Sequence, residues 1–149
     1  MIKRALIIVL NIMVISLCFA QSNTIYQDSV SGFYLTQSHE GFIGENYETL
    51  ILQDKPSISL SEIKKVSQNF DMLGKPAVFI VLNDSGKEKL KNITTSYSGE
   101  PLVIYFGRKI ILAPIMTSPI TEGEMIISGN FTIQETDGMV NWLKSRIGN

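Results

Sequence analysis

The sequence predicts an α+β fold in which helices pack on one face of a mostly antiparallel, mixed sheet. Three observations lead to this prediction. Two apolar segments, Leu102–Phe106 and Lys109–Ala113, flank the dipeptide Gly107-Arg108, a spacing that is typical of a β-hairpin. The run Ala77–Leu82 is apolar throughout and rich in β-branched residues, as in a strand buried on both faces. Two further segments have a serine or threonine followed three residues later by glutamate, the capping-box pattern of a helix start.

The first segment, Met1–Ala20, has the pattern of a secretory signal peptide. Two basic residues precede an apolar run, and we predict cleavage after Ala20. The run is shorter than the roughly 20 apolar residues that span a bilayer comfortably, which favours a cleaved signal over the alternative, a retained anchor. A lipoprotein signal is not favoured, because Leu17, directly before Cys18, is not small.

The predicted mature chain has the size and charge of one acidic domain. Removal of 20 residues from 149 leaves 129, enough for a single core, and removal of two of the 13 basic residues leaves 11 against 14 acidic ones. The resulting net charge of −3, without a basic cluster, disfavours nucleic acid as a partner. The only cysteine leaves with the signal, and secretion without disulfides is typical of a bacterial envelope. We therefore expect export through the inner membrane to the periplasm or the extracellular space.

The mature chain is predicted to hold a flexible leader at 21–31 and a single domain at 32–149, with an N-terminal β extension at 32–52. Two β-like runs, Phe33–Leu35 and Tyr47–Leu52, make up this extension, and a glycine-rich loop lies between them.

A first helix is predicted after the capping box Ser59–Glu62. Three apolar residues, Ile63, Val66 and Phe70, recur there at helical spacing. A glycine and a proline soon after Phe70 would end this helix.

A second helix is predicted after the strand Ala77–Leu82. Asn83 or Asp84 would cap it, and its apolar stripe consists of Leu90, Ile93 and Tyr97.

The remaining elements are the hairpin, a short strand and a final helix. Because glycine comes first in Gly107-Arg108, a type II′ turn is expected. Met125–Ser128 is the predicted strand, and the capping box Thr132–Glu135 starts the last helix. Trp142 lies beside the apolar stripe of that helix, which consists of Met139, Val140, Leu143 and Ile147.

The residues that could carry chemistry are few. His39 is the only histidine, and one histidine without cysteine partners is a poor zinc site. A solvated loop histidine is the favoured interpretation, so no catalytic residue, metal or cofactor is predicted. The alternative is a small secreted hydrolase in which a cleft brings His39 close to a serine and a carboxylate.

A candidate binding segment lies between two prolines. Its residues are apolar, and the connection that carries them is expected to reach the surface, where apolar patches often mark partner sites. Methionine also adapts to varied partners. The alternative is a loop that folds back to cover the core. The predicted partner-binding residues are Pro114, Ile115, Met116, Pro119 and Ile120.

From Leu52 to Arg146 the chain resembles the periplasmic head of the first large loop of SecD, a membrane subunit that assists protein export. The similar phrases, in order, are ILQDKPSISLSEIKKV, GKPAVFIVLNDSGKEKLKNIT and SGEPLVIYFGRKIILAPIMTSPITEGEMIISGNFTIQET. The last phrase is the most specific, because it includes both an A-P-x-I turn and an I-S-G-x-F-T helix cap.

The resemblance implies a SecDF P1 head-like fold in a stand-alone secreted chain. It also implies contact with extended or unfolded polypeptide, in protein export or envelope assembly. SecD couples proton flow to export through charged residues in transmembrane helices, and the predicted mature chain has none, so that motor activity is not implied. The predicted function is a non-enzymatic binding module, with the hydrolase or a structural or inhibitory envelope protein as alternatives.

Overall fold

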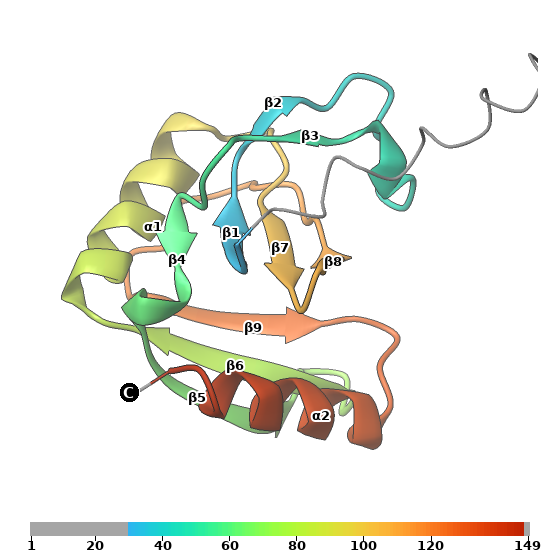
Figure 1. Cartoon of the computed structure of the whole chain (residues 1–149), viewed down its shortest axis with the longest axis vertical. Helices are drawn as coiled ribbons and strands as arrows, with labels where there is room; N and C mark the ends of the chain where they lie inside the picture. The colour runs from blue at the N-terminus through green and yellow to red at the C-terminus, as the bar shows by residue number, and fades with distance from the viewer. Residues whose placement is uncertain (1–29, 148–149) are drawn as a thin grey trace, which may run out of the picture.

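A computed structural model describes residues 30–147 of the chain (Figure 1). The predicted signal peptide and most of the leader lie outside the described residues, so the boundaries at residues 20 and 31 stay predictions. The helices are α1 (Asp84–Ser96) and α2 (Ile133–Lys144), with single 3₁₀ turns η1 (Tyr47–Thr49) and η2 (Leu60–Glu62). The strands are β1 (Gly32–Tyr34), β2 (Thr36–Ser38), β3 (Ile51–Leu52), β4 (Ile58–Ser59), β5 (Ile63–Phe70), β6 (Pro76–Leu82), β7 (Val103–Phe106), β8 (Lys109–Leu112) and β9 (Glu124–Ser128).

The strands of the described residues form three sheets, with strand orders β4-β1-β7-β8, β2-β3 and β5-β6-β9. Every strand pair in them is antiparallel. Figure 1 shows β1 and β7 running across the direction of β6 and β9. The predicted α+β class is confirmed, although the strands divide among three sheets where one was expected. The apolar run Ala77–Leu82 lies in β6, the central strand of its sheet, as predicted.

The main core lies between the four-stranded sheet, the three-stranded sheet and the helices. Phe33 and Phe106 reach it from the four-stranded sheet, and their rings meet edge to face with centroids 5.5 Å apart. Ile80 of β6, Leu90 of α1 and Leu143 of α2 are fully buried in the same cluster. One continuous core therefore joins all the larger elements.

A second, smaller core covers the opposite face of the four-stranded sheet. Because neighbouring residues of a strand point to opposite faces, Tyr34 and Tyr105 face away from the main core and pack against each other. Leu50 and Leu52, next to or within β3, complete this cluster. Strand β7 is consequently buried on both faces.

The predicted helix from Ile63 to Phe70 is wrong. The capping box exists, since Glu62 accepts a hydrogen bond from the backbone N–H of Ser59 at 2.9 Å, but it caps only the single turn η2. The chain continues as β5, in which a register shift near Lys65 places both Ile63 and Val66 opposite core-facing residues of β6. A β-bulge therefore produced the three-residue spacing that resembled a helix.

Three other predictions of local structure can be compared with the structure. The helices α1 and α2 form as predicted, with Asn83 and Thr132 as their N-cap residues. The hairpin forms, but φ is positive at both Gly107 (59°) and Arg108 (68°), so the turn is of type I′ and the predicted type II′ is wrong. In the predicted run Tyr47–Leu52, the first three residues form η1 and only the last two form a strand.

Candidate functional site

The predicted binding segment extends the β7–β8 hairpin. Leu102 donates its backbone N–H to the carbonyl of Pro114 (2.9 Å), and Met116 donates to Glu100 (2.9 Å). The segment thus runs antiparallel to the residues before β7. Met116 is only 6% exposed and belongs to the main core, whereas Ile115 points outward and is 46% exposed.

The end of the same segment is fixed to α1 by Thr94. The Thr94 hydroxyl is fully buried, donates to the carbonyl of Leu90 (2.8 Å) and accepts the backbone N–H of Ile120 (2.9 Å). Ile120 packs partly buried against the core, while Pro114 and Pro119 stay exposed. The segment therefore partly follows the alternative of a loop that covers the core, and its role in partner binding stays a prediction.

The structure places His39 in the exposed loop after β2. Its Nδ1 lies 3.2 Å from the hydroxyl oxygen of Thr36. His39 does not line the pocket described next. Within residues 30–147, no group of three or more His, Cys, Asp or Glu side chains could hold a metal ion.

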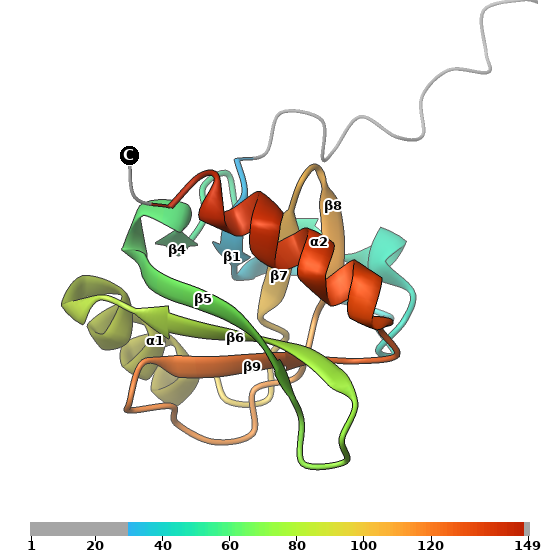
Figure 2. The ribbon, with the colours of Figure 1, turned by 90° about the horizontal axis from the view of Figure 1, so that it is seen from below.

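A pocket of about 420 Å³ lies between the β7–β8 hairpin and α2. Figure 2 shows α2 crossing in front of β8. We call this pocket the α2–β8 groove; it was not predicted from the sequence, although Trp142 had been placed beside the apolar stripe. The groove is lined by Phe106, Gly107, Lys109, Ile110, Ile111, Phe131, Glu135, Gly138, Met139 and Trp142.

Two faces of α2 have different roles. Thr136, Val140 and Leu143 are buried and attach the helix to the core. A neighbouring face, with Gly138 and Met139, lines the groove. A Cβ atom added at Gly138 would meet no other heavy atom within 4 Å, so the missing side chain leaves open space there.

Trp142 forms an ordered aromatic wall of the groove. Its ring centroid lies 6.1 Å from that of Phe106, and the guanidinium carbon of Arg146 lies 4.1 Å from the ring centroid. Arg146 also donates a hydrogen bond to the carbonyl of Trp142 (3.2 Å), which keeps the cation over the ring. Gly107 also lies beside the indole, since a Cβ atom added there would be 3.8 Å from Cε2 of Trp142.

Two opposite charges lie among the otherwise apolar lining residues. The pKa of Glu135 is lowered, chiefly because its carboxylate accepts hydrogen bonds from the backbone N–H and the hydroxyl of Thr132, and to a lesser extent because of Lys109. The lowered pKa keeps the Glu135 carboxylate charged at neutral pH. The groove thus combines aromatic and aliphatic walls with one anion and one cation.

Strand β8 is the edge strand of the four-stranded sheet, and it lines the groove. Phe106 pairs with Lys109 across the turn, and Tyr105 pairs with Ile110. In a hairpin with a two-residue turn, the pair next to the turn, here Phe106 and Lys109, exchanges backbone hydrogen bonds, and the following pair does not. The backbone N–H and C=O of Ile110 therefore point away from β7. The groove therefore lies beside outward-pointing main-chain groups.

None of the helices formed by residues 30–147 has the length and apolar character needed to cross a membrane.

These features define an antiparallel α+β domain with an apolar groove beside a sheet edge. Residues 31–146 match the family described as SecDF, P1 head subdomain, and the chain belongs to that family. The resemblance predicted from Leu52–Arg146 is confirmed, and the match also includes the first strands.

The chain is similar to larger proteins. It is 31% identical over 91 residues to the protein translocase subunit SecD of Dictyoglomus turgidum, covering 61% of this chain and 23% of that protein. It is likewise 31% identical over 101 residues to SecD of Rickettsia typhi, covering 68% of this chain and 19% of that protein. The chain thus spans about a fifth of the length of these relatives.

A solved structure supports the fold. It is described as "Structure and function of a membrane component SecDF that enhances protein export", and it aligns with a TM-score of 0.66 at 23% identity. The alignment covers 78% of this chain and 62% of that one. At this level of identity the similarity establishes the fold alone.

Proposed function

We propose that this domain is a non-enzymatic module that binds unfolded or extended polypeptide during protein export or envelope assembly. The observation that carries the proposal is the α2–β8 groove, where apolar and aromatic walls adjoin an edge strand that no other strand of the described residues covers. Extended polypeptide is bound by such edges through its main chain and by adjoining pockets through its side chains. The names of the relatives, protein translocase subunits, agree with a role in export.

The lining residues favour binding over bond cleavage. All of them are apolar, aromatic or glycine except Lys109 and Glu135. The Glu135 carboxylate accepts two hydrogen bonds from Thr132, so it serves as part of the α2 cap. The groove therefore offers contact surfaces rather than an adjacent nucleophile and base.

The proposed location is outside the inner membrane, in the periplasm or beyond. The signal-peptide pattern of Met1–Ala20 supports export, and a mature N-terminus at Gln21 in the exported protein is expected.

Binding can be measured by the fluorescence anisotropy of a labelled secretory protein kept unfolded by reduction and alkylation. We expect saturable binding to the full-length chain with a micromolar Kd, competition by the unlabelled unfolded protein and no competition by its folded form. An anisotropy that stays constant up to about 1 mM of the chain would contradict the proposed function.

A further inference from the structure

We propose that polypeptide binds by adding a strand to the free edge of β8 and inserting an apolar side chain into the α2–β8 groove. This inference rests on the proposed function, and it specifies how binding occurs and which segments are bound. The partner is an extended, uncharged segment of another polypeptide, with large apolar residues at alternate positions.

The first step of the argument concerns the main chain. Among the strands formed by residues 30–147, β8 pairs only with β7, and Ile110 directs its N–H and C=O away from that partner. Such groups on an edge strand are ready to pair with another strand. A register shift within β8 and Pro114 soon after it keep the usable edge short. The edge therefore fits a single short strand rather than a large sheet.

The second step concerns the side chains of β8. Ile110 packs against the second core and Ile111 packs against the main core, and both residues line the groove. Successive side chains of a regular added strand point to opposite faces of the sheet, so every second side chain of the incoming segment would point to the groove side. There it would meet Met139 and Trp142 of α2. The open space at Gly138 leaves room for a large apolar side chain.

The third step concerns charge. Lys109 and Glu135 place one cation and one anion among the residues that line the groove, so the charges of the lining itself balance. A charged side chain that entered the groove would lose its hydration, and any attraction to one of these two groups would be offset by repulsion from the other. Uncharged segments are therefore preferred over acidic or basic ones, which defines the class of polypeptide bound.

The test uses Trp142, the only tryptophan in the chain, as an internal probe of the groove. The full-length protein is titrated with a short, uncharged, tryptophan-free peptide that alternates valine and threonine around a central leucine. We expect a saturable change in tryptophan fluorescence. Replacement of the central leucine by aspartate should weaken binding about tenfold or more.

The main-chain part of the proposal is tested with N-methylated peptides. One peptide is methylated at nitrogens on one edge of the strand and another at nitrogens on the opposite edge, with identical side chains. Only one edge can face β8, so we expect one peptide to lose about tenfold in affinity and the other to bind as before. Equal affinities of both for the protein would overturn strand addition.

The groove is tested with Gly138→Leu, which fills the open space on α2. Leucine is the better helix former, so folding is expected to be retained. Asn141→Leu is the matched control, because Asn141 is exposed on the same helix and does not line the groove. We expect Gly138→Leu to weaken peptide binding about tenfold and Asn141→Leu to leave it unchanged.

The outcomes separate this inference from the proposed function. If the unfolded protein binds in the anisotropy assay while Gly138→Leu has no effect, polypeptide binds elsewhere and this inference fails alone. If sedimentation shows that the edge instead pairs two copies of the chain and so excludes peptide, this inference also fails. Absence of any anisotropy change contradicts the proposed function, and this inference with it.

Discussion

At the scale of single residues, Thr94 connects two segments that are distant in the sequence. Its buried hydroxyl accepts the backbone N–H of Ile120 and donates to Leu90, so it completes the hydrogen bonds of both α1 and the loop. Removal of a buried acceptor leaves the Ile120 N–H without that partner, and such a group costs about 1–3 kcal/mol. We therefore expect Thr94→Val to lower the free energy of unfolding by about that amount, measured by urea denaturation.

The matched control is the neighbouring residue on the same helix. Thr95 also donates its hydroxyl to a backbone carbonyl, that of Lys91 at 2.7 Å, but it is exposed. Thr95→Val is expected to change stability by less than about 0.5 kcal/mol, because water replaces the lost bond. Equal effects of the two substitutions would contradict the role assigned to Thr94.

Glu62 is a second residue whose surroundings affect stability, in this case through its pKa. Burial alone would raise its pKa, but the ion pair with Lys89 (2.7 Å) and hydrogen bonds from Ser59 and Ser85 together outweigh burial and lower it. In the unfolded chain a glutamate has a pKa of about 4.3. The unfolded state therefore binds the proton more readily than the folded state. The contribution of Glu62 to stability is complete above its pKa in the unfolded chain, and it disappears as the pH falls through its lower pKa in the folded protein.

We accordingly expect Glu62→Gln to lower the free energy of unfolding at neutral pH. We also expect this free energy to fall less steeply in the variant as the pH is lowered from about 5 to about 3. The measurement is urea denaturation across that range. Glu122→Gln serves as the control, since Glu122 pairs with Lys87 at 3.5 Å on the exposed surface and such pairs contribute little. An unchanged acid profile in Glu62→Gln would show that other groups govern the acid sensitivity.

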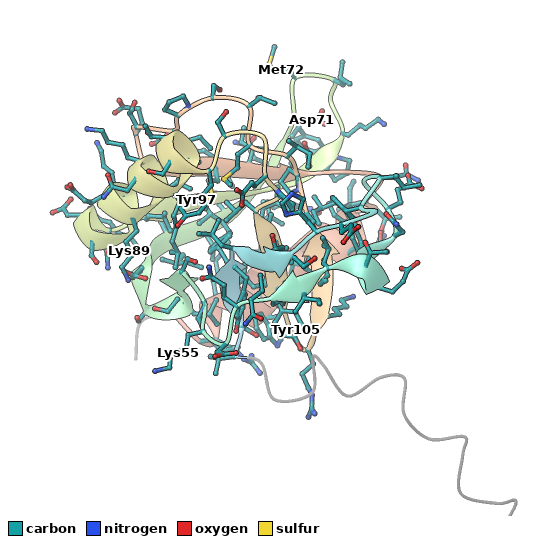
Figure 3. All side chains as sticks on the ribbon, turned by 90° about the horizontal axis from the view of Figure 1, so that it is seen from above. Lys55, Asp71, Met72, Lys89, Tyr97 and Tyr105 are labelled. Carbon is teal, nitrogen blue, oxygen red and sulfur yellow. The ribbon has the colours of Figure 1, made fainter. Side chains whose placement is uncertain are left out.

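At the scale of elements, the β5–β6 hairpin shows how one side chain organises a turn. The Asp71 carboxylate accepts the backbone N–H groups of both Leu73 and Lys75 at 2.9 Å. Gly74 supplies the positive φ of 75° that the turn requires. Figure 3 shows Asp71 and Met72 at the end of this hairpin, away from the body of the domain.

Asp71→Ala is expected to destabilise the protein by about 1 kcal/mol and to speed amide exchange at Leu73 and Lys75. Met72→Ser provides the control, because Met72 is fully exposed at the same turn and has no packing to lose. Unaltered exchange at both amides in Asp71→Ala would refute this account of the turn.

The elements also show which patterns could be predicted. Helix α2 was predicted correctly because the bonds between Thr132 and Glu135 are local, and the sequence spacing determines them. The same pattern at Ser59–Glu62 was followed by a strand, because pairing of β5 with β6 along its whole length outweighed a weak helical preference. A capping box predicts where a helix can start but not how far it continues.

At the scale of the whole molecule, the α2–β8 groove depends on packing that no local pattern encodes. Residues 106–111 and 131–142 meet only because α2 packs on the core beside the edge of the four-stranded sheet. The exposure of the predicted binding segment was decided in the same way, since Met116 enters the core while Ile115 stays outside. Both results depend on contacts between distant parts of the chain.

Caps, turns and apolar runs act over a few residues, so they alone predicted the α+β class, both helices, the central strand β6 and the β7–β8 hairpin. The family followed from the resemblance of longer phrases to the SecD head. The division into three sheets, the β5 bulge, the burial of Met116 and the position of the groove became visible only in the folded chain. The physical reason is that side-chain burial and strand pairing depend on distant partners, whose placement emerges when the elements pack together.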